Sequence, residues 1–109
     1  MSMSPLLERV RYHICDHFQL PEDKVDAMLP AFLTTLQNHM KNIEDALGAN
    51  DPATIGRMGH ALKGALLNFG LDDMADIANM IEDEGKSGNS GADFSGMVQR
   101  LKEKLAEIL

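Results

Sequence analysis

The sequence has no tryptophan, one tyrosine and an aromatic content of only 5%. Such a chain offers few of the aromatic surfaces on which bases stack in nucleic-acid complexes. Ten basic residues stand against seventeen acidic ones, and the net charge of −7 has the wrong sign for a nonspecific nucleic-acid binder. We therefore expect no nucleic-acid partner.

Cysteine and long apolar runs are also scarce. The single cysteine, Cys15, cannot form an internal disulfide framework, which agrees with a reducing compartment. No apolar run approaches the roughly 20 residues that a membrane helix needs. The N-terminus lacks the charged and then apolar pattern of a signal peptide. These absences predict a cytoplasmic protein without a membrane partner.

The 109 residues are 44% hydrophobic, which suffices for one core, and we expect a single domain over residues 1–109. Two sites carry a helix start signal, a capping residue followed by proline at the first helical position: Ser4 with Pro5, and Asp51 with Pro52. Apolar residues recur at three- and four-residue spacing, and no alternating strand pattern occurs. These apolar stripes cover residues 6–18, 32–47, 55–69, 71–81 and 94–108.

Proline and glycine mark the expected boundaries between these helices. A short segment opens at Pro21, and Pro30 should break or kink it, because proline removes a helical donor and clashes with the preceding turn. Gly70 is a natural left-handed helix stop, and residues 85–91 form a flexible connection. Because short connections place sequential helices antiparallel, we expect an all-α fold: an up-down four-helix bundle with an additional N-terminal helix in residues 1–20.

The segment 55–69 carries a histidine that does not fit its apolar stripe. At about 100° per residue, His60 lies about 160° from the centre of the stripe and faces solvent or a partner. Gly56 and Gly64 flank it by one turn on the same face, although each costs about 1 kcal/mol relative to alanine in a helix. The plausible reason for both glycines is access of another protein to the imidazole. Imidazole is a nucleophile, and Lys63 offers positive charge to a phosphoryl group.

The run from His60 to Gly70, HALKGALLNFG, resembles the signature of histidine-containing phosphotransfer (HPt) domains. That signature reads His-x-hydrophobic-Lys-Gly, then five mostly small or apolar residues and a glycine. The segments 28–33 and 50–52 are similar to the family's entry into its second helix and to the acidic turn before the histidine helix. The resemblance covers roughly residues 25–109, the expected family-like core.

The resemblance implies a helical bundle whose exposed histidine exchanges phosphoryl groups with receiver-domain aspartates or accepts them from a histidine kinase. His60 matches the phosphorylated histidine and Lys63 the nearby lysine, while Gly64 matches the glycine that leaves room for the partner. With Gly56, Arg57 and Leu67, Gly64 would form the docking surface. The domain would be a phosphoryl carrier without its own ATP site, and no cofactor is expected.

Two positions depart from the family pattern. Leu66 stands where a small residue is common, but its periodicity points it inward, where a repacked core can absorb it. Asn79 stands where many members have glutamate, and we place it on the outer side of its helix. The change at Leu66 need not impair function.

Glu82 is a candidate partner of the histidine. If the chain reverses near Gly70, the residue as far beyond the turn as His60 lies before it is 81 or 82. A carboxylate accepting from one imidazole nitrogen would fix the tautomer and leave the other nitrogen free to attack. The position also resembles the glutamate of chemotaxis-type phosphotransfer domains. A solvated glutamate on the flank of the helix is the equally weighted alternative.

Two other functional classes remain open. A helical adaptor could bind receivers without phosphotransfer, although the intact His60 and Lys63 disfavour it. His13 and His17, spaced four apart, could hold a metal ion on one helix face, but no third ligand is evident and packing or surface placement is favoured.

Overall fold

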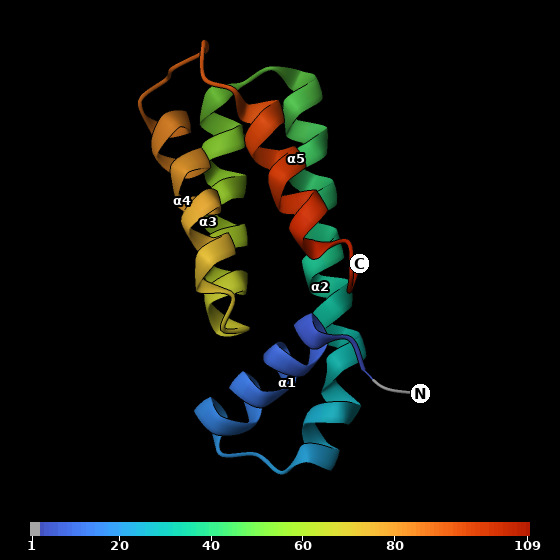
Figure 1. Cartoon of the computed structure of the whole chain (residues 1–109). Helices are drawn as coiled ribbons and strands as arrows, with labels where there is room; N and C mark the ends of the chain where they lie inside the picture. The colour runs from blue at the N-terminus through green and yellow to red at the C-terminus, as the bar shows by residue number, and fades with distance from the viewer. Residues whose placement is uncertain (1–2) are drawn as a thin grey trace.

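The structure, a computed structural model, describes residues 3–109, and five helices occupy this range (Figure 1). Residues 1 and 2, the start of the expected N-terminal segment, lie outside the described residues. The expectation of an all-helical fold is confirmed. The helices are α1 (Pro5–Phe18), α2 (Glu22–Ala49), α3 (Pro52–Asn68), α4 (Asp72–Lys86) and α5 (Phe94–Leu105).

Two helices begin at the capping residues that the sequence indicates. The Ser4 hydroxyl accepts a hydrogen bond from the backbone N–H of Leu7 at 3.2 Å, at the start of α1. At the start of α3, the Asp51 carboxylate accepts from the Ala53 N–H at 3.2 Å and from the Thr54 hydroxyl at 2.7 Å. These side chains supply acceptors for donors that have no partner inside the helix.

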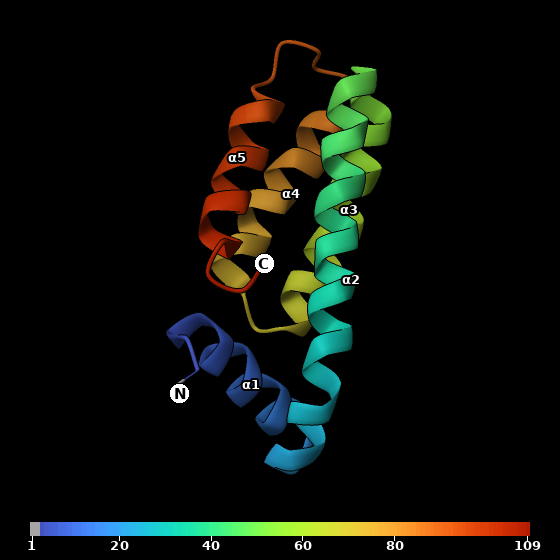
Figure 2. The same cartoon turned by 90° about the vertical axis from the view of Figure 1, so that its right-hand side faces the viewer.

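Helices α2 to α5 lie side by side, and α1 packs across the lower part of α2 in both views (Figures 1 and 2). The most extensive helix pair is α3 with α4, joined by a short turn at Gly70 and Leu71. Gly70 has a φ of 74°, the left-handed conformation that its place after α3 predicts. The α3–α4 pair thereby forms a tight hairpin.

One hydrophobic core joins all five helices, α1 included. Leu6, Val10 and Ile14 form the buried side of α1, and Arg9 ties the same helix to the α3–α4 turn. The Arg9 guanidinium donates to the Gly70 carbonyl at 3.1 Å and to Asp73 at 2.7 Å, which lowers the pKa of that carboxyl. None of the helices within residues 3–109 combines the length and apolarity needed to cross a membrane.

Of the break or kink expected at Pro30, the break does not occur, since α2 continues through this residue from Glu22 to Ala49. The carbonyl left without a helical donor belongs to Asp26, and both Asp26 and Pro30 are exposed, so water can reach this part of the helix. On either side of it, Leu29 and Leu36 are buried in the core. Packing on both sides therefore holds the helix together across one missing hydrogen bond.

The flexible connection also begins later than the sequence indicates. Helix α4 extends to Lys86, so Gly85 is a buried helical residue rather than the start of a loop. A Cβ atom added at Gly85 would lie 2.6 Å from the backbone nitrogen of Gly56 on α3. Glycine at this position therefore serves close helix packing, which the sequence pattern alone cannot distinguish from a helix end.

Candidate functional site

His60 lies on the solvent side of α3, opposite the buried residues Ile55, Leu62 and Leu66. Its side chain is 69% exposed. Leu66 is fully buried, as the inward orientation expected from its periodicity requires. The imidazole is thus accessible to a partner, while the apolar side of α3 packs in the hydrophobic core.

Glu82 comes to His60 from α4, and the His60 Nδ1 atom lies 2.9 Å from its Oε2 atom. The α3–α4 hairpin produces this pairing, because the two residues stand at similar distances from the turn at Gly70. Glu82 is only 2% exposed, so the alternative of a solvated flank residue is wrong. A buried carboxylate requires compensating partners, and the neighbouring side chains supply them.

Two lysines pair with the Glu82 carboxylate, one at each oxygen. Lys63 Nζ lies 2.6 Å from Oε1 and Lys86 Nζ lies 2.7 Å from Oε2. The contact with Lys63 is an attraction between charges without the alignment of a hydrogen bond. Lys63, Lys86 and His60 together lower the pKa of Glu82 to about 2, against the opposing effect of burial. In turn, the Glu82 carboxylate raises the pKa of Lys86.

The low pKa of Glu82 determines which imidazole nitrogen is free. At neutral pH the carboxylate is ionised and can only accept hydrogen bonds. Nδ1 of His60 must therefore carry the proton in the 2.9 Å contact. In the neutral imidazole the lone pair then belongs to Nε2, which becomes the nucleophilic atom.

Sequence reasoning missed Lys86 and misjudged Asn79. The four-residue spacing of Glu82 and Lys86 along one helix was a signal for the first, because such residues are neighbours on a helix surface. Asn79 is half-buried rather than on the outer side, and its side-chain oxygen accepts from Lys63 Nζ at 3.2 Å. Its amide nitrogen donates to Asp83 at 3.3 Å. Asn79 thus holds Lys63 against α4.

The two glycines that flank His60 have different environments. Gly64 is exposed, and a Cβ atom added there would meet nothing within 4 Å. Gly56 is buried, and a Cβ atom there would lie 3.1 Å from the Cα atom of Gly85. Gly56 therefore allows α3 and α4 to approach each other, which is a reason for glycine at this position other than access. Its expected part in a docking surface stays a prediction.

Surfaces on both sides of His60 are hollowed. Toward α1 and α2, apolar side chains that include Phe18 and Phe32 border Gly64, and Leu67 is 47% exposed on the same helix as His60. Between α3 and α4, a second hollow has His60 and Glu82 in its wall together with Arg57. Arg57 is exposed and donates from Nη2 to the Thr54 hydroxyl at 3.0 Å.

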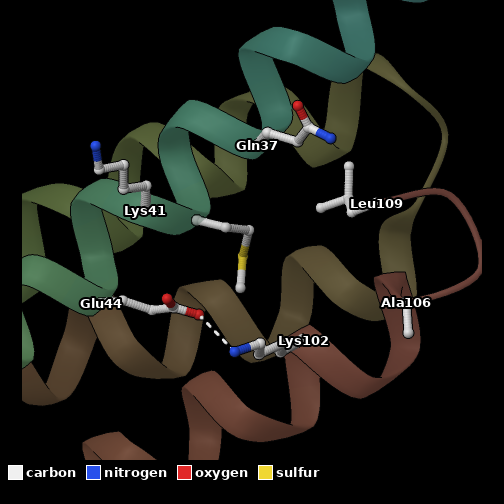
Figure 3. A pocket seen from close by; sticks show the side chains of 7 residues that line it. Gln37, Lys41, Glu44, Lys102, Ala106 and Leu109 are labelled. Carbon is white, nitrogen blue, oxygen red and sulfur yellow. Dashed lines mark ion pairs between the residues drawn. The ribbon is translucent and has the colours of Figure 1, made fainter.

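Other regions lack a comparable arrangement. The rings of His13 and His17 stack at 5.3 Å, and no group of three or more metal-ligating side chains occurs in residues 3–109. A groove between α2 and the C-terminal segment involves no residue of α3 or α4 (Figure 3). Its lining residues are Gln37, Met40, Lys41, Glu44, Lys102, Ala106 and Leu109.

The fold and the site define a helical bundle that presents a solvent-facing histidine backed by a buried carboxylate. The family model for the Hpt domain matches residues 27–109. The chain belongs to the Hpt domain family. Helix α1 lies outside the matched residues.

Two similar proteins are the phosphorelay proteins LuxU of Vibrio vulnificus strains YJ016 and CMCP6. Each is 27% identical to this chain over 88 residues, which cover 78% of the chain and 76% of the relative. No solved structure matches the chain.

Proposed function

We propose that this protein is a phosphocarrier of two-component or phosphorelay signalling, with His60 as the phosphoryl acceptor. The observation that carries the proposal is the pairing of an exposed imidazole with a buried carboxylate 2.9 Å from Nδ1. This pairing leaves Nε2 free on the solvent side of the ring. Membership in the Hpt domain family and the similarity to phosphorelay protein LuxU support the same function.

The transfer step follows from the tautomer. The Nε2 lone pair attacks the phosphorus of a phosphoaspartate on a receiver domain, so that a P–N bond forms as the P–O bond to the aspartate breaks. The aspartate leaves as a carboxylate, and Nδ1 keeps its proton. The ring thereby gains positive charge, which the ionised Glu82 stabilises through the existing hydrogen bond.

The reaction is reversible in principle, so the same site can return the group to a receiver aspartate or accept it from a histidine kinase. We assign the protein the role of a carrier without its own ATP site, and the partner would supply the magnesium ion for the chemistry. Such a carrier would work in the cytoplasm, together with receiver and kinase domains.

The partner would dock on the face that surrounds His60. Gly64 leaves open space one turn beyond the imidazole, and Leu67 offers an exposed apolar side chain next to it. Arg57 lies one turn before His60 and is also exposed. A receiver domain could therefore bring its aspartate to Nε2 without a clash with α3.

The proposed carrier is one domain over residues 1–109. Helices α2 to α5 form the up-down antiparallel bundle that carries the phosphohistidine, and α1 is an additional N-terminal helix. The shared core of all five helices supports this organisation.

The test is incubation of the protein with a labelled phosphoreceiver, followed by analysis of the label. The parent should acquire a label that is labile in acid and stable in base, as a phosphoimidazole is. His60→Gln should acquire none, because glutamine lacks the nucleophile. His17→Gln is the matched control, since it removes another exposed histidine and should leave the labelling unchanged.

Circular dichroism should show the same helical content in the parent and both variants. A labelled His60→Gln protein would contradict the assignment of His60. A parent that binds the receiver and never becomes labelled would instead indicate an adaptor without phosphotransfer.

A further inference from the structure

A hollow of about 440 Å³ opens between α3 and α4 directly beside His60. Helices α3 and α4 meet at Gly56 and Gly85, where an added Cβ atom would crowd the backbone of the other helix. Ala53 and Gly56 provide an apolar floor. Two cationic side chains, Arg57 and Lys86, stand with His60 around this floor.

The lysine of the signature motif is less accessible to a further ligand than Lys86 is. Lys63 is 25% exposed, its charge is paired with Glu82 Oε1 at 2.6 Å, and it donates a hydrogen bond to Asn79 at 3.2 Å. Asn79 is itself held by Asp83, so the ammonium group is enclosed by acceptors of α4. Lys63 therefore serves mainly to compensate the buried carboxylate.

Lys86 differs from Lys63 in exposure and in position. Its side chain is 69% exposed, and its Nζ atom contacts the same carboxylate oxygen that accepts the His60 Nδ1 proton. The ammonium group and the imidazole therefore lie side by side, 2.7 Å and 2.9 Å from one atom. An ammonium has three N–H donors, so two remain available while one stays with Glu82.

Arg57 is the second cationic side chain that lines the hollow. Its guanidinium has five N–H donors, and Thr54 accepts from one nitrogen, Nη2, at 3.0 Å. Carboxylates lie near both cations, Glu82 and Asp83 near Lys86 and Asp51 near Arg57. Both cationic side chains nevertheless stay exposed beside the imidazole. The lining of the hollow is itself mostly apolar, so the positive charge available to an anion beside His60 comes from these two side chains.

We propose that Lys86 and Arg57, which border this hollow beside His60, contact the oxygens of the phosphoryl group on His60. The inference rests on the proposed phosphotransfer function. During transfer to Nε2 the P–N bond forms, the bond to the leaving group breaks, and negative charge stays on the phosphoryl oxygens. Lys86 and Arg57 stabilise that charge, whereas Lys63 keeps the carboxylate in place.

The experiment uses phosphoramidate as a small phosphoryl donor, so that partner docking does not contribute to the rate. Phosphoramidate transfers its phosphoryl group to Nε2 and releases ammonia, with the proton supplied by water. Lys86→Met and Arg57→Met remove one charge each at the hollow. Lys102→Met is the matched control, because Lys102 is also exposed and paired with a glutamate, at 3.5 Å on the remote groove (Figure 3).

We expect Lys86→Met to slow labelling roughly three- to tenfold, the effect of losing one charge-assisted contact to the transferred group. Arg57→Met should slow labelling in the same direction, Lys86→Arg should retain most of the rate, and Lys102→Met should match the parent. Labelling of Lys86→Met and Arg57→Met at the rate of the Lys102→Met control would overturn the proposal.

A second measurement separates direct contact from an effect through Glu82. Phosphohistidine is stable in base, so NMR titration of the Lys86 side chain is possible in the phosphorylated protein. A phosphoryl dianion in contact favours the ammonium form and should raise the pKa of Lys86 above its value in the unphosphorylated protein. An unchanged or lower pKa would overturn the contact, even if labelling were slow. Failure of the parent to label at all would instead refute the proposed function.

Discussion

At the scale of single residues, the site is organised around Glu82 rather than around the histidine. This buried carboxylate accepts from His60 and pairs with Lys63 and Lys86, which together bring its pKa to about 2. It therefore stays ionised throughout the neutral range and always presents an acceptor to Nδ1. The chemistry of the exposed ring is thus set by a side chain that solvent hardly reaches.

Replacing Glu82 by alanine should change the tautomer of His60 and slow phosphoryl acceptance without abolishing it. The Nδ1 proton loses its acceptor, so the population with a free Nε2 lone pair should fall. Ring ¹⁵N chemical shifts measure the tautomer, and labelling by phosphoramidate measures the rate. Asp76→Ala, at an exposed position of the same helix, should alter neither quantity. Superimposable ¹⁵N spectra in the parent and Glu82→Ala would remove Glu82 from the site.

At the scale of the elements, the α3–α4 pair depends on glycine for two separate reasons. Gly56 and Gly85 allow the backbones of the two helices to meet, which places Glu82 against the ring. A Cβ atom added at Gly64 would meet nothing within 4 Å, so this glycine leaves open space for a partner that approaches from outside. Helix packing at Gly56 and access at Gly64 thus involve positions about two turns apart on α3.

Substitutions at Gly64 and Gly85 should separate these two reasons. Gly85→Ala should lower the free energy of unfolding by about 1–3 kcal/mol, because the added methyl group would overlap the backbone of Gly56. Gly64→Gln should hold or raise the stability, since glutamine has the better helix propensity, by up to about 1 kcal/mol. Urea denaturation followed by circular dichroism gives both values.

The same Gly64→Gln variant should receive phosphate slowly from a phosphoreceiver yet label normally with phosphoramidate, because only the protein partner needs the open space. Transfer from the receiver at the parent rate would show that Gly64 does not clear a docking surface. A loss of stability in Gly64→Gln would show that the position is more restricted than the open space around it indicates.

At the scale of the whole molecule, α1 is joined to the other helices by buried side chains and by ion pairs of Arg9 and Arg11. Val10 and Ile14 are almost inaccessible to solvent, and Arg9 bonds the α3–α4 turn. Arg11 contacts Asp26 at the start of α2 at 2.6 Å. The helix outside the family match therefore shares the core that supports the site.

If residues 1–109 unfold as one unit, a cavity in α1 should destabilise the whole bundle. Ile14→Ala is expected to lower the free energy of unfolding by about 2–4 kcal/mol. Tyr12→Ala, on the same helix and 74% exposed, should change it by less than about 0.5 kcal/mol. Amide hydrogen exchange in α3 and α4 shows whether the substitution in α1 also destabilises these two helices. Unaltered exchange in those helices would indicate that α1 unfolds separately.

The sequence by itself determined the helical class, two of the caps and the direction in which His60 points. These features depend on neighbours within about one or two helical turns, so that periodicity and capping residues suffice to predict them. The motif around His60 likewise lies within one helix, and it directed attention to Lys63 and Gly64. Glu82 could be proposed because a tight hairpin pairs residues at equal distances from its turn.

Only the tertiary structure decided how these parts meet. It showed Glu82 to be buried, brought Lys86 and Asn79 to the site, and placed Gly56 in the helix interface with Gly85. It also carried α2 unbroken through Pro30. In each case the outcome depends on what packs against the residue from another part of the chain. A local pattern gives the face of a helix, but the depth of burial and the charges opposite that face arise only when the helices are assembled.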